Sequence, residues 1–187
     1  LVWRSQSTRP QEFLSVVARK WKMVITQLDG NIQLTVRGPE IQSTTGHCPA
    51  DGEWLGVIFK LGTYMPHLPT IKLVNGEVNL AGAGDRSFWL HGEAWEFPTF
   101  ANVDVFVARL VREGLLVHEP VVAAALQNQT TDLSLRSVQR RFLHATGLTQ
   151  GLVSQIERAR LAVTLLKQGV PILDTVDQAG YADQPHL

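Results

Sequence analysis

Arginine and glutamine side chains gather between positions 133 and 147, and they are the residues of this chain best suited to chemistry. An arginine can form two hydrogen bonds with the edge of guanine, and a glutamine can do the same with adenine. The side chains expected to read bases in this way are Arg136, Gln139 and Arg140. Those expected to contact phosphates, which sets register without reading sequence, are Ser137, Arg141 and Thr146.

The residues around these side chains predict a helix that presents them. Ser134 is a typical N-cap residue, and Gly147 ends the helical pattern. Within residues 135–145, the apolar residues expected to share one face are Leu135, Val138, Phe142 and Ala145. Arg136, Arg140 and His144 lie opposite. The apolar face should pack and the cationic face should remain free. A merely solvated face is the alternative, because charged helix surfaces are common.

Further helices are predicted on both sides of this one. Pro120 is suited to a helix start, a short helix follows over 121–126, and polar residues 127–132 form a turn. The strongest helical pattern covers 149–168, with apolar residues at Leu152, Ile156, Ala159, Val163 and Leu166. Pro171 opens another short helix, Gly180 forms a tight turn, and Asp183 is a suitable N-cap for a further helix.

The pattern from residue 119 onward therefore repeats one plan: a short helix, a turn and a second helix, twice, joined by a long helix. A connecting helix of about seventeen residues spans about 25 Å. With the offsets of the two reading helices, this length approaches the turn of B-DNA, about 34 Å, so both helices could enter successive major grooves.

The first hundred residues carry strand patterns instead. Two β-rich runs, 21–28 and 32–36, flank Asp29-Gly30 as a hairpin, and 52–60 forms another strand. Asn75-Gly76 predicts a second hairpin between 71–74 and 77–80. These features favour a small antiparallel β domain, barrel-like or sandwich-like. Trp54, Phe59 and Trp89 could line a ligand pocket there, although an ordinary aromatic core is the commoner arrangement.

The predicted organisation is a two-domain α+β chain. Residues 1–100 form the β-rich domain, 101–118 a connecting helix and linker, and 119–187 an all-α domain. The helix that begins near Asn102 and stops at Gly114 has one apolar stripe, which could pack on the β domain or pair with its copy in a homodimer.

Composition and motifs exclude several classes of protein. Lys and Arg balance Asp and Glu at 17 each, so no overall field indicates a polyanionic partner. A single cysteine, Cys48, permits no internal disulfide and suits the cytoplasm, and no apolar run reaches the length of a membrane helix. No nucleophile elbow or phosphate-binding loop occurs, and His47 and His91 lack metal-ligand spacing. We therefore expect no catalytic residue, cofactor or metal.

The helical segment resembles the DNA-binding domain of the AraC/XylS family of bacterial transcription regulators. The resemblance covers about the last 68 residues and is carried by three stretches, Ser134 to Gly147, Arg158 to Leu166, and the segment from Pro171 with its Ala-Gly-Tyr-x-Asp-Gln run. It implies that Arg136, Gln139 and Arg140 are the reading positions of a first helix-turn-helix. Those of a second begin at Gln184, Pro185 and His186.

The family's second recognition helix continues for about two further turns, whereas this sequence ends at Leu187. We therefore expect an incomplete second unit and weak DNA binding by this chain alone. The family also places a regulatory domain, often a cupin-like β barrel that binds an effector or dimerises, before the DNA-binding domain. The run GVIFKLG, at 56–62, bears a weak resemblance to a segment of such domains.

The leading hypothesis is a cytoplasmic, effector-responsive transcription regulator that reads two adjacent major-groove segments of double-stranded DNA. Its expected partners are duplex DNA, a small-molecule effector and a second copy of the chain, without a membrane. The alternative is a small-molecule-binding or enzymatic cupin-like β barrel whose helices serve for packing or for contact with a partner.

Overall fold

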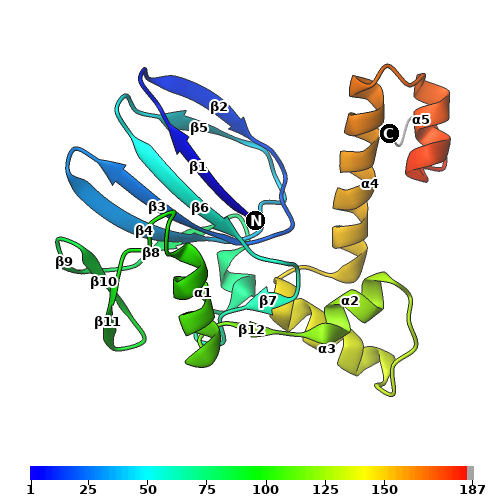
Figure 1. Ribbon diagram of the computed structural model, residues 1–187. Helices are drawn as coiled ribbons and strands as arrows, with labels where there is room; N and C mark the ends of the chain where they lie inside the picture. The colour runs from blue at the N-terminus through cyan, green and yellow to red at the C-terminus, as the bar shows by residue number, and fades with distance from the viewer. Residues whose placement is uncertain (185–187) are drawn as a thin grey trace.

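The main sheet of this protein has five antiparallel strands in the order β1-β6-β3-β4-β8 in the computed structural model, which describes residues 1–184 (Figure 1). Its strands are β1 (Val2–Gln6), β3 (Lys22–Leu28), β4 (Asn31–Arg37), β6 (Glu53–Ile58) and β8 (Glu77–Asn79). The turn between β3 and β4 has positive φ angles at Asp29 and Gly30, 50° and 78°. Such angles match the twist of a tight hairpin, and this predicted hairpin is confirmed.

The inner face of this sheet forms the main core. Its fully or nearly fully buried side chains alternate along the strands, namely Met23, Ile25, Leu34, Val36, Leu55 and Val57. Helix α1 (Val103–Arg112) packs Phe106 and Leu110 into this core. A three-stranded sheet of β9 (Gly82–Gly84), β10 (Ser87–Leu90) and β11 (Glu93–Glu96) adds Phe88 and Trp95. Most of the apolar stripe of α1 thus packs within the chain, whereas Val111 is 56% exposed.

A two-stranded ribbon, β2 (Gln11–Ser15) and β5 (Thr44–Cys48), accompanies the main sheet. Figure 1 shows the ribbon beside β1 and β6, on the side away from α1. The edge strands of the main sheet, β1 and β8, do not pair with each other in the described part of the chain. The expectation of a barrel-like domain is therefore wrong in one respect: the sheets are antiparallel but open.

The hairpin expected over residues 71–80 is also wrong. Thr70–Leu73 form a short 3₁₀ helix, η1, and β8 pairs with β4 instead. Pro69, directly before η1, has a fixed φ angle and no N–H, which favours the start of a helical turn. Thr70 is buried and Leu73 packs on the main core, so this turn is held by tertiary contacts.

The short strand β12 (Val117–His118) pairs with β7 (Thr63–Tyr64), and within the described residues it is followed by four helices. They are α2 (Pro120–Leu126), α3 (Leu135–Thr146), α4 (Gln150–Lys167) and α5 (Ile172–Ala179), close to the predicted ranges. In Figure 1, α2 and α3 lie beneath α4, and α5 packs on its far end. No helix in the described part of the chain is long and apolar enough to cross a membrane.

The helices and the β region share a second core. Its buried members are Val122, Ala125, Phe142, Ala145, Leu148, Val153 and Ile156. Side chains from the first 74 residues pack against them, namely Val17, Ile41, Leu61, Tyr64 and Val74. The α2–α3 pair is therefore attached to the β region through apolar packing.

Candidate nucleic-acid interface

Helix α3 begins and ends as its sequence predicts. The Ser134 hydroxyl accepts a hydrogen bond from the Ser137 backbone N–H at 3.3 Å, which satisfies one of the free donors of the first turn. Gly147 follows the helix with φ 73°, a left-handed conformation that glycine adopts without a steric penalty. The position of α3 along the chain is therefore fixed by local chemistry.

One face of α3 is packed and the opposite face is free. Phe142 and Ala145 are each 1% exposed and lie against Val122 and Ala125 of α2. The prediction that Leu135 joins this face is wrong, because its side chain is 71% exposed. Leu135 is the first residue of α3, so it lies beyond the reach of the α2 core.

The three predicted base-reading residues lie on the free face. Arg136, Gln139 and Arg140 are all exposed. None of their side chains makes a hydrogen bond or ion pair with another residue of the described part of the chain. Two guanidinium groups and one carboxamide therefore keep their donors and acceptors available for a partner.

All three predicted phosphate contacts are engaged within the protein. The expectation that Thr146 contacts a phosphate is wrong, because its side chain is buried and its hydroxyl donates to the Phe142 carbonyl at 2.8 Å. The Ser137 hydroxyl lies 3.0 Å from the Ser134 hydroxyl, in the N-cap of α3. An Arg141 guanidinium nitrogen lies 3.8 Å from Glu119 Oε1, and this carboxylate also accepts the Val121 backbone N–H at the start of α2. Arg141 thus joins α3 to the first turn of α2. The sequence offered no sign of this role, because Glu119 lies 22 positions away.

The end of α3 is held by the β region. Thr70 of η1 donates its hydroxyl hydrogen to the His144 carbonyl at 2.6 Å, and the Tyr64 ring packs edge-on against the His144 imidazole at 5.0 Å. A Cβ on Gly147 would lie only 2.8 Å from the Thr70 carbonyl oxygen. The free face of α3 is therefore presented in an orientation that the β region helps to set.

Helix α4 is the predicted connecting helix, and α5 is the first helix of the second predicted unit. Arg158 donates to the Gly180 carbonyl at 3.1 Å and lies over the Tyr181 ring at 5.4 Å, so it connects α4 to the end of α5. The apolar stripe predicted for α4 is only partly buried, since Val163 and Leu166 are 50% and 41% exposed. Only the first half of α4 reaches the shared core, which explains the difference.

The predicted reading residues of this second unit lie at the edge of the described chain. Gln184 is exposed and is the last described residue, and Pro185 and His186 lie outside the described residues.

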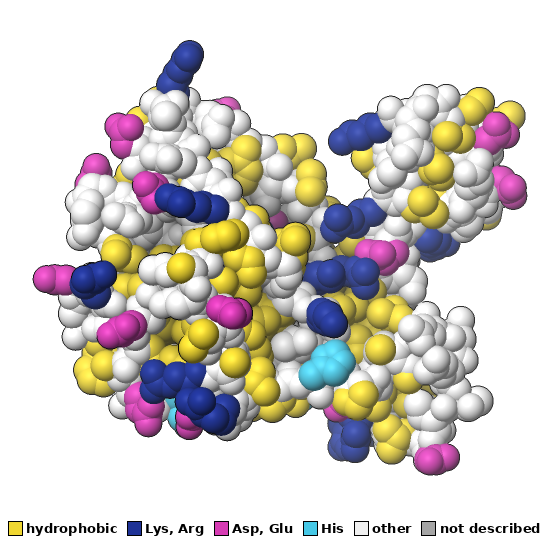
Figure 2. Space-filling view, in the orientation of Figure 1, with side chains coloured by type: hydrophobic (Ala, Val, Ile, Leu, Met, Phe, Trp, Pro, Cys, Tyr) yellow, Lys and Arg dark blue, Asp and Glu magenta, His cyan; other side chains and the backbone are white. Residues whose placement is uncertain are grey.

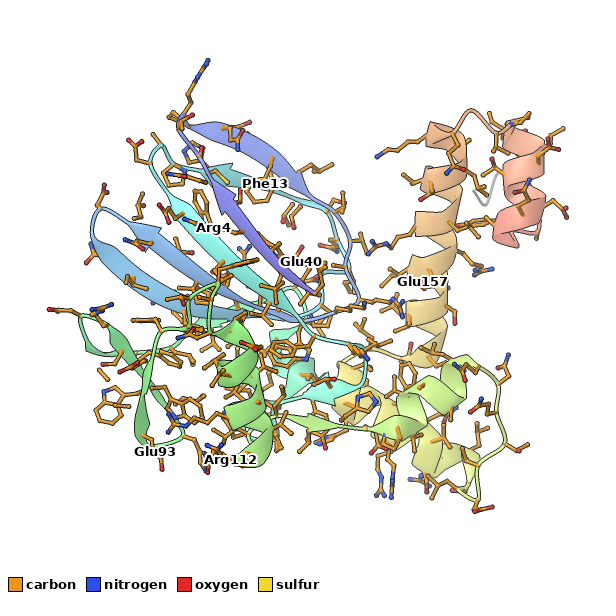
Figure 3. All side chains as sticks on the ribbon, viewed as in Figure 1. Arg4, Phe13, Glu40, Glu93, Arg112 and Glu157 are labelled. Carbon is orange, nitrogen blue, oxygen red and sulfur yellow. The ribbon has the colours of Figure 1, made fainter. Side chains whose placement is uncertain are left out.

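A basic cleft separates the β region from α4. Figure 2 shows Lys and Arg side chains gathering there. The cleft has a volume of about 330 Å³, and its basic lining residues include Arg19, Lys20, Lys60 and Arg160. Arg19 is paired with Glu157, which projects from α4 in Figure 3. Because these residues are spread over 140 positions, no sequence motif indicates the cleft.

The three predicted ligand-lining aromatics do not lie together. Trp54 lines a cavity of about 470 Å³ next to the main sheet. Phe59 is buried and stacks on Trp21 with ring centroids 4.1 Å apart, and Trp89 is 49% exposed on β10. The hypothesis of a pocket shared by Trp54, Phe59 and Trp89 is wrong, because Phe59 belongs to the packed core and Trp89 to the other sheet.

Two histidines meet beside the loop that leads to η1. The rings of His67 and His91 lie 5.2 Å apart. Burial lowers the pKa of His67 from its ordinary value of 6.5, and the neighbouring His91 lowers it further. No group of three or more metal-binding side chains occurs in the described part of the chain, so the pair is incomplete as a metal site.

Comparison of this chain with protein-family models, with curated proteins and with solved structures finds no match in any of the three.

Proposed function

We propose that this protein is a sequence-specific transcription regulator of the AraC/XylS kind, in which α3 lies in the major groove of double-stranded DNA. The observation that carries the proposal is the division of α3 into two faces. Phe142 and Ala145 fix one face in the core, while Arg136, Gln139 and Arg140 leave the other free for base edges. Helix α2 is then the supporting helix of a helix-turn-helix.

The second unit would use the same plan at the far end of α4. With 18 residues, α4 is about 27 Å long, which supports the spacing of two adjacent major-groove segments. Helix α5 is then the supporting helix, and its reading positions begin at Gln184, Pro185 and His186.

The β region would act as the sensor of an effector or as a dimerisation domain. Its contacts with α3 support this proposal, because a change in the β region can reach the reading helix through Thr70 and Tyr64 without passing through a flexible linker. The basic cleft adds local positive charge to a chain whose formal net charge is zero, which favours approach to phosphates.

The test is the affinity for DNA of variants matched in charge. Duplexes are first selected from a random pool with residues 1–187 at low salt, and affinity is measured by fluorescence anisotropy. Replacing Arg140 with Ala should weaken binding by about 1 to 3 kcal/mol. The control is Arg112→Ala. Arg112 is an exposed arginine of α1, labelled in Figure 3, and its replacement removes the same charge at a site away from α3. Equal losses for both variants would contradict the proposal.

A small-molecule-binding protein whose helices serve only for packing is the alternative. The shared core favours this alternative, because packing against the β region is by itself a sufficient structural role for α2 and α3. Under this alternative the Arg136, Gln139 and Arg140 variants all keep the wild-type behaviour, and no duplex is enriched by selection.

A further inference from the structure

The cavity beside Trp54 lies between the outer face of the main sheet and the ribbon formed by β2 and β5, and we call it the ribbon cavity. Its volume is about 470 Å³, within the usual range for small-molecule sites. Residues of β1, β3, β4, β6 and β8 line its sheet wall, and residues of β2 and β5 line its ribbon wall. Figure 3 labels Phe13, which lies on the ribbon.

Aromatic rings cover glycines in both walls. Trp3 lies opposite Gly56 in the β1–β6 pairing, and a Cβ on Gly56 would overlap its indole ring. On the ribbon, Phe13 lies opposite Gly46 in the same way. Each glycine lets a ring approach the backbone closely, as in the aromatic covering of strand glycines. The two walls therefore face each other with aromatic surfaces across a space that suits a planar ring.

One end of the ribbon cavity is cationic. Lys22 and Arg37 lie directly opposite each other in the β3–β4 pairing, an arrangement of like charges that is unfavourable on its own. Lys22 Nζ lies 3.4 Å from Glu40, and Arg37 Nε lies 2.5 Å from Glu77. These contacts use one donor of each cation, so an arginine with five donors and a lysine with three keep several available.

The charges of the wall favour an anion at this end. The lysine, arginine and carboxylate side chains that line the cavity are two cations, Lys22 and Arg37, and one carboxylate, Glu77. Glu40 does not line it. The rings lie one step further along the sheet. Val24 follows Lys22 on the same face and pairs with Gly56, which Trp3 covers, so the cations lie one pleat, about 7 Å, from the Trp3 ring along the strand direction, with Lys22 one strand and Arg37 two strands to the side of Gly56.

We propose that the ribbon cavity binds a planar aromatic carboxylate, with its ring between Trp3 and Phe13 and its carboxylate on Arg37 and Lys22. This deepens the proposed function by naming the class of effector, and its regulatory meaning rests on that function. Binding to the cavity itself does not require DNA, so the two proposals can fail separately.

The test is isothermal titration calorimetry of residues 1–187, without DNA, using benzoate, indole-3-acetate and 2-naphthoate, with 2-naphthamide as the neutral analogue. At least one carboxylate should bind one-to-one with a Kd below about 1 mM. The naphthamide should bind about tenfold more weakly than the naphthoate, because it lacks the charge that Arg37 and Lys22 recognise.

Substitutions then separate the ring from the charge. Arg37→Gln and Lys22→Met should each weaken carboxylate binding about tenfold and leave naphthamide binding unchanged. Trp3→Leu should weaken the binding of both compounds. Trp89→Leu, which removes an exposed indole from the other sheet, is the matched control and should have no effect.

Three outcomes would overturn the proposal: no saturable binding of any carboxylate, wild-type affinity in Trp3→Leu, or equal effects of Trp89→Leu and Trp3→Leu. Circular dichroism of each variant identifies loss of fold. If Arg37→Gln unfolds, Lys22→Met provides the test of the charge instead. Carboxylate binding together with an absence of DNA binding would support the cavity and contradict the proposed regulator.

Discussion

The two helical units of this chain follow one plan but are supported very differently. In the first, Val122 is fully buried and Phe142 is 1% exposed, within a core that the β region completes. In the second, Ile172 and Leu173 of α5 are 47% and 70% exposed, and α5 contacts the end of α4. The same succession of short helix, turn and helix therefore has a fixed orientation in one place and little tertiary support in the other.

This difference indicates which helices a structural change in the β region would affect first. Thr70 and Tyr64 contact α3 directly, whereas α5 packs on α4. We therefore expect a change in the β region to act first on the α2–α3 pair.

The largest expected effect is a loss of folding stability that should occur for a substitution in the first unit but not for one in the second. Replacing Phe142 with Ala should destabilise the protein by about 3 to 5 kcal/mol, because a large buried ring is lost from the shared core. All five tryptophans lie in the first 95 residues, so their fluorescence reports the β region. In urea unfolding, Phe142→Ala should shift the transition seen by tryptophan fluorescence as well as that seen by circular dichroism.

Val176→Ala, in α5, is the comparison and should leave the fluorescence transition in place. If Phe142→Ala also leaves it unchanged, the first unit is energetically independent of the β region.

Two glycines with nearly the same backbone conformation give a finer comparison. Gly147 and Gly180 end α3 and α5 with φ 73° and 70°. Alanine should cost about 1 to 2 kcal/mol at Gly180, where the added Cβ meets only an arginine side chain at 3.9 Å. Gly147→Ala should cost more, because its Cβ would lie 2.8 Å from the Thr70 carbonyl. Equal urea midpoints for the two variants would show that η1 moves aside to accommodate the added Cβ at little cost in free energy.

The attachment of α5 should depend on Arg158. Its removal to Ala takes away the hydrogen bond to Gly180 and the contact with Tyr181, a loss of about 1 kcal/mol. Amide hydrogen exchange over residues 172–180 should become faster, with exchange in α3 unchanged. Arg160→Ala, on the same helix, is the control. Faster exchange in α3 would mean that the two units are coupled more strongly than their contacts indicate.

The smallest effect concerns pH. Because the pKa of His67 is lowered in the folded protein, its contribution to stability is present above 6.5 and is lost as the pH falls through the folded pKa. The melting temperature should therefore decrease between pH 7.5 and 5, and less so in His67→Gln. His67 precedes η1, so the variant should change the pH response of α3 rather than that of α5. An unchanged pH dependence would exclude His67 as its source.

Local features were predictable from the sequence. The cap at Ser134, the stop at Gly147 and the periodicity between them define α3 without reference to the rest of the chain. The hairpin at Asp29-Gly30 is similarly local. By contrast, Thr70 meets His144 across 74 positions, and no local pattern indicates such a contact.

The ribbon cavity illustrates the same limit. Of the three aromatics expected to line a pocket, Trp54 lines this cavity and Phe59 and Trp89 do not, whereas Trp3 and Phe13 also line it. The strands that carry Trp3 and Phe13 are mostly exposed, so they lack the alternation of buried and exposed residues that identifies a strand. Which aromatic ring faces a cavity is decided by pairing register, such as Trp3 opposite Gly56, and the register emerges only in the fold.

The central claim is that the free face of α3 reads bases, and the most direct measurement is the base preference of selected duplexes. We predict that Gln139→Ala and Arg136→Ala each lose preference at one position of the selected site, with the remaining positions unchanged and a cost of about 1 to 3 kcal/mol. Arg141→Ala, which removes the contact with Glu119, should instead weaken binding to all sequences alike. Uniform loss of affinity in Gln139→Ala and Arg136→Ala, with base preference intact, would contradict the claim.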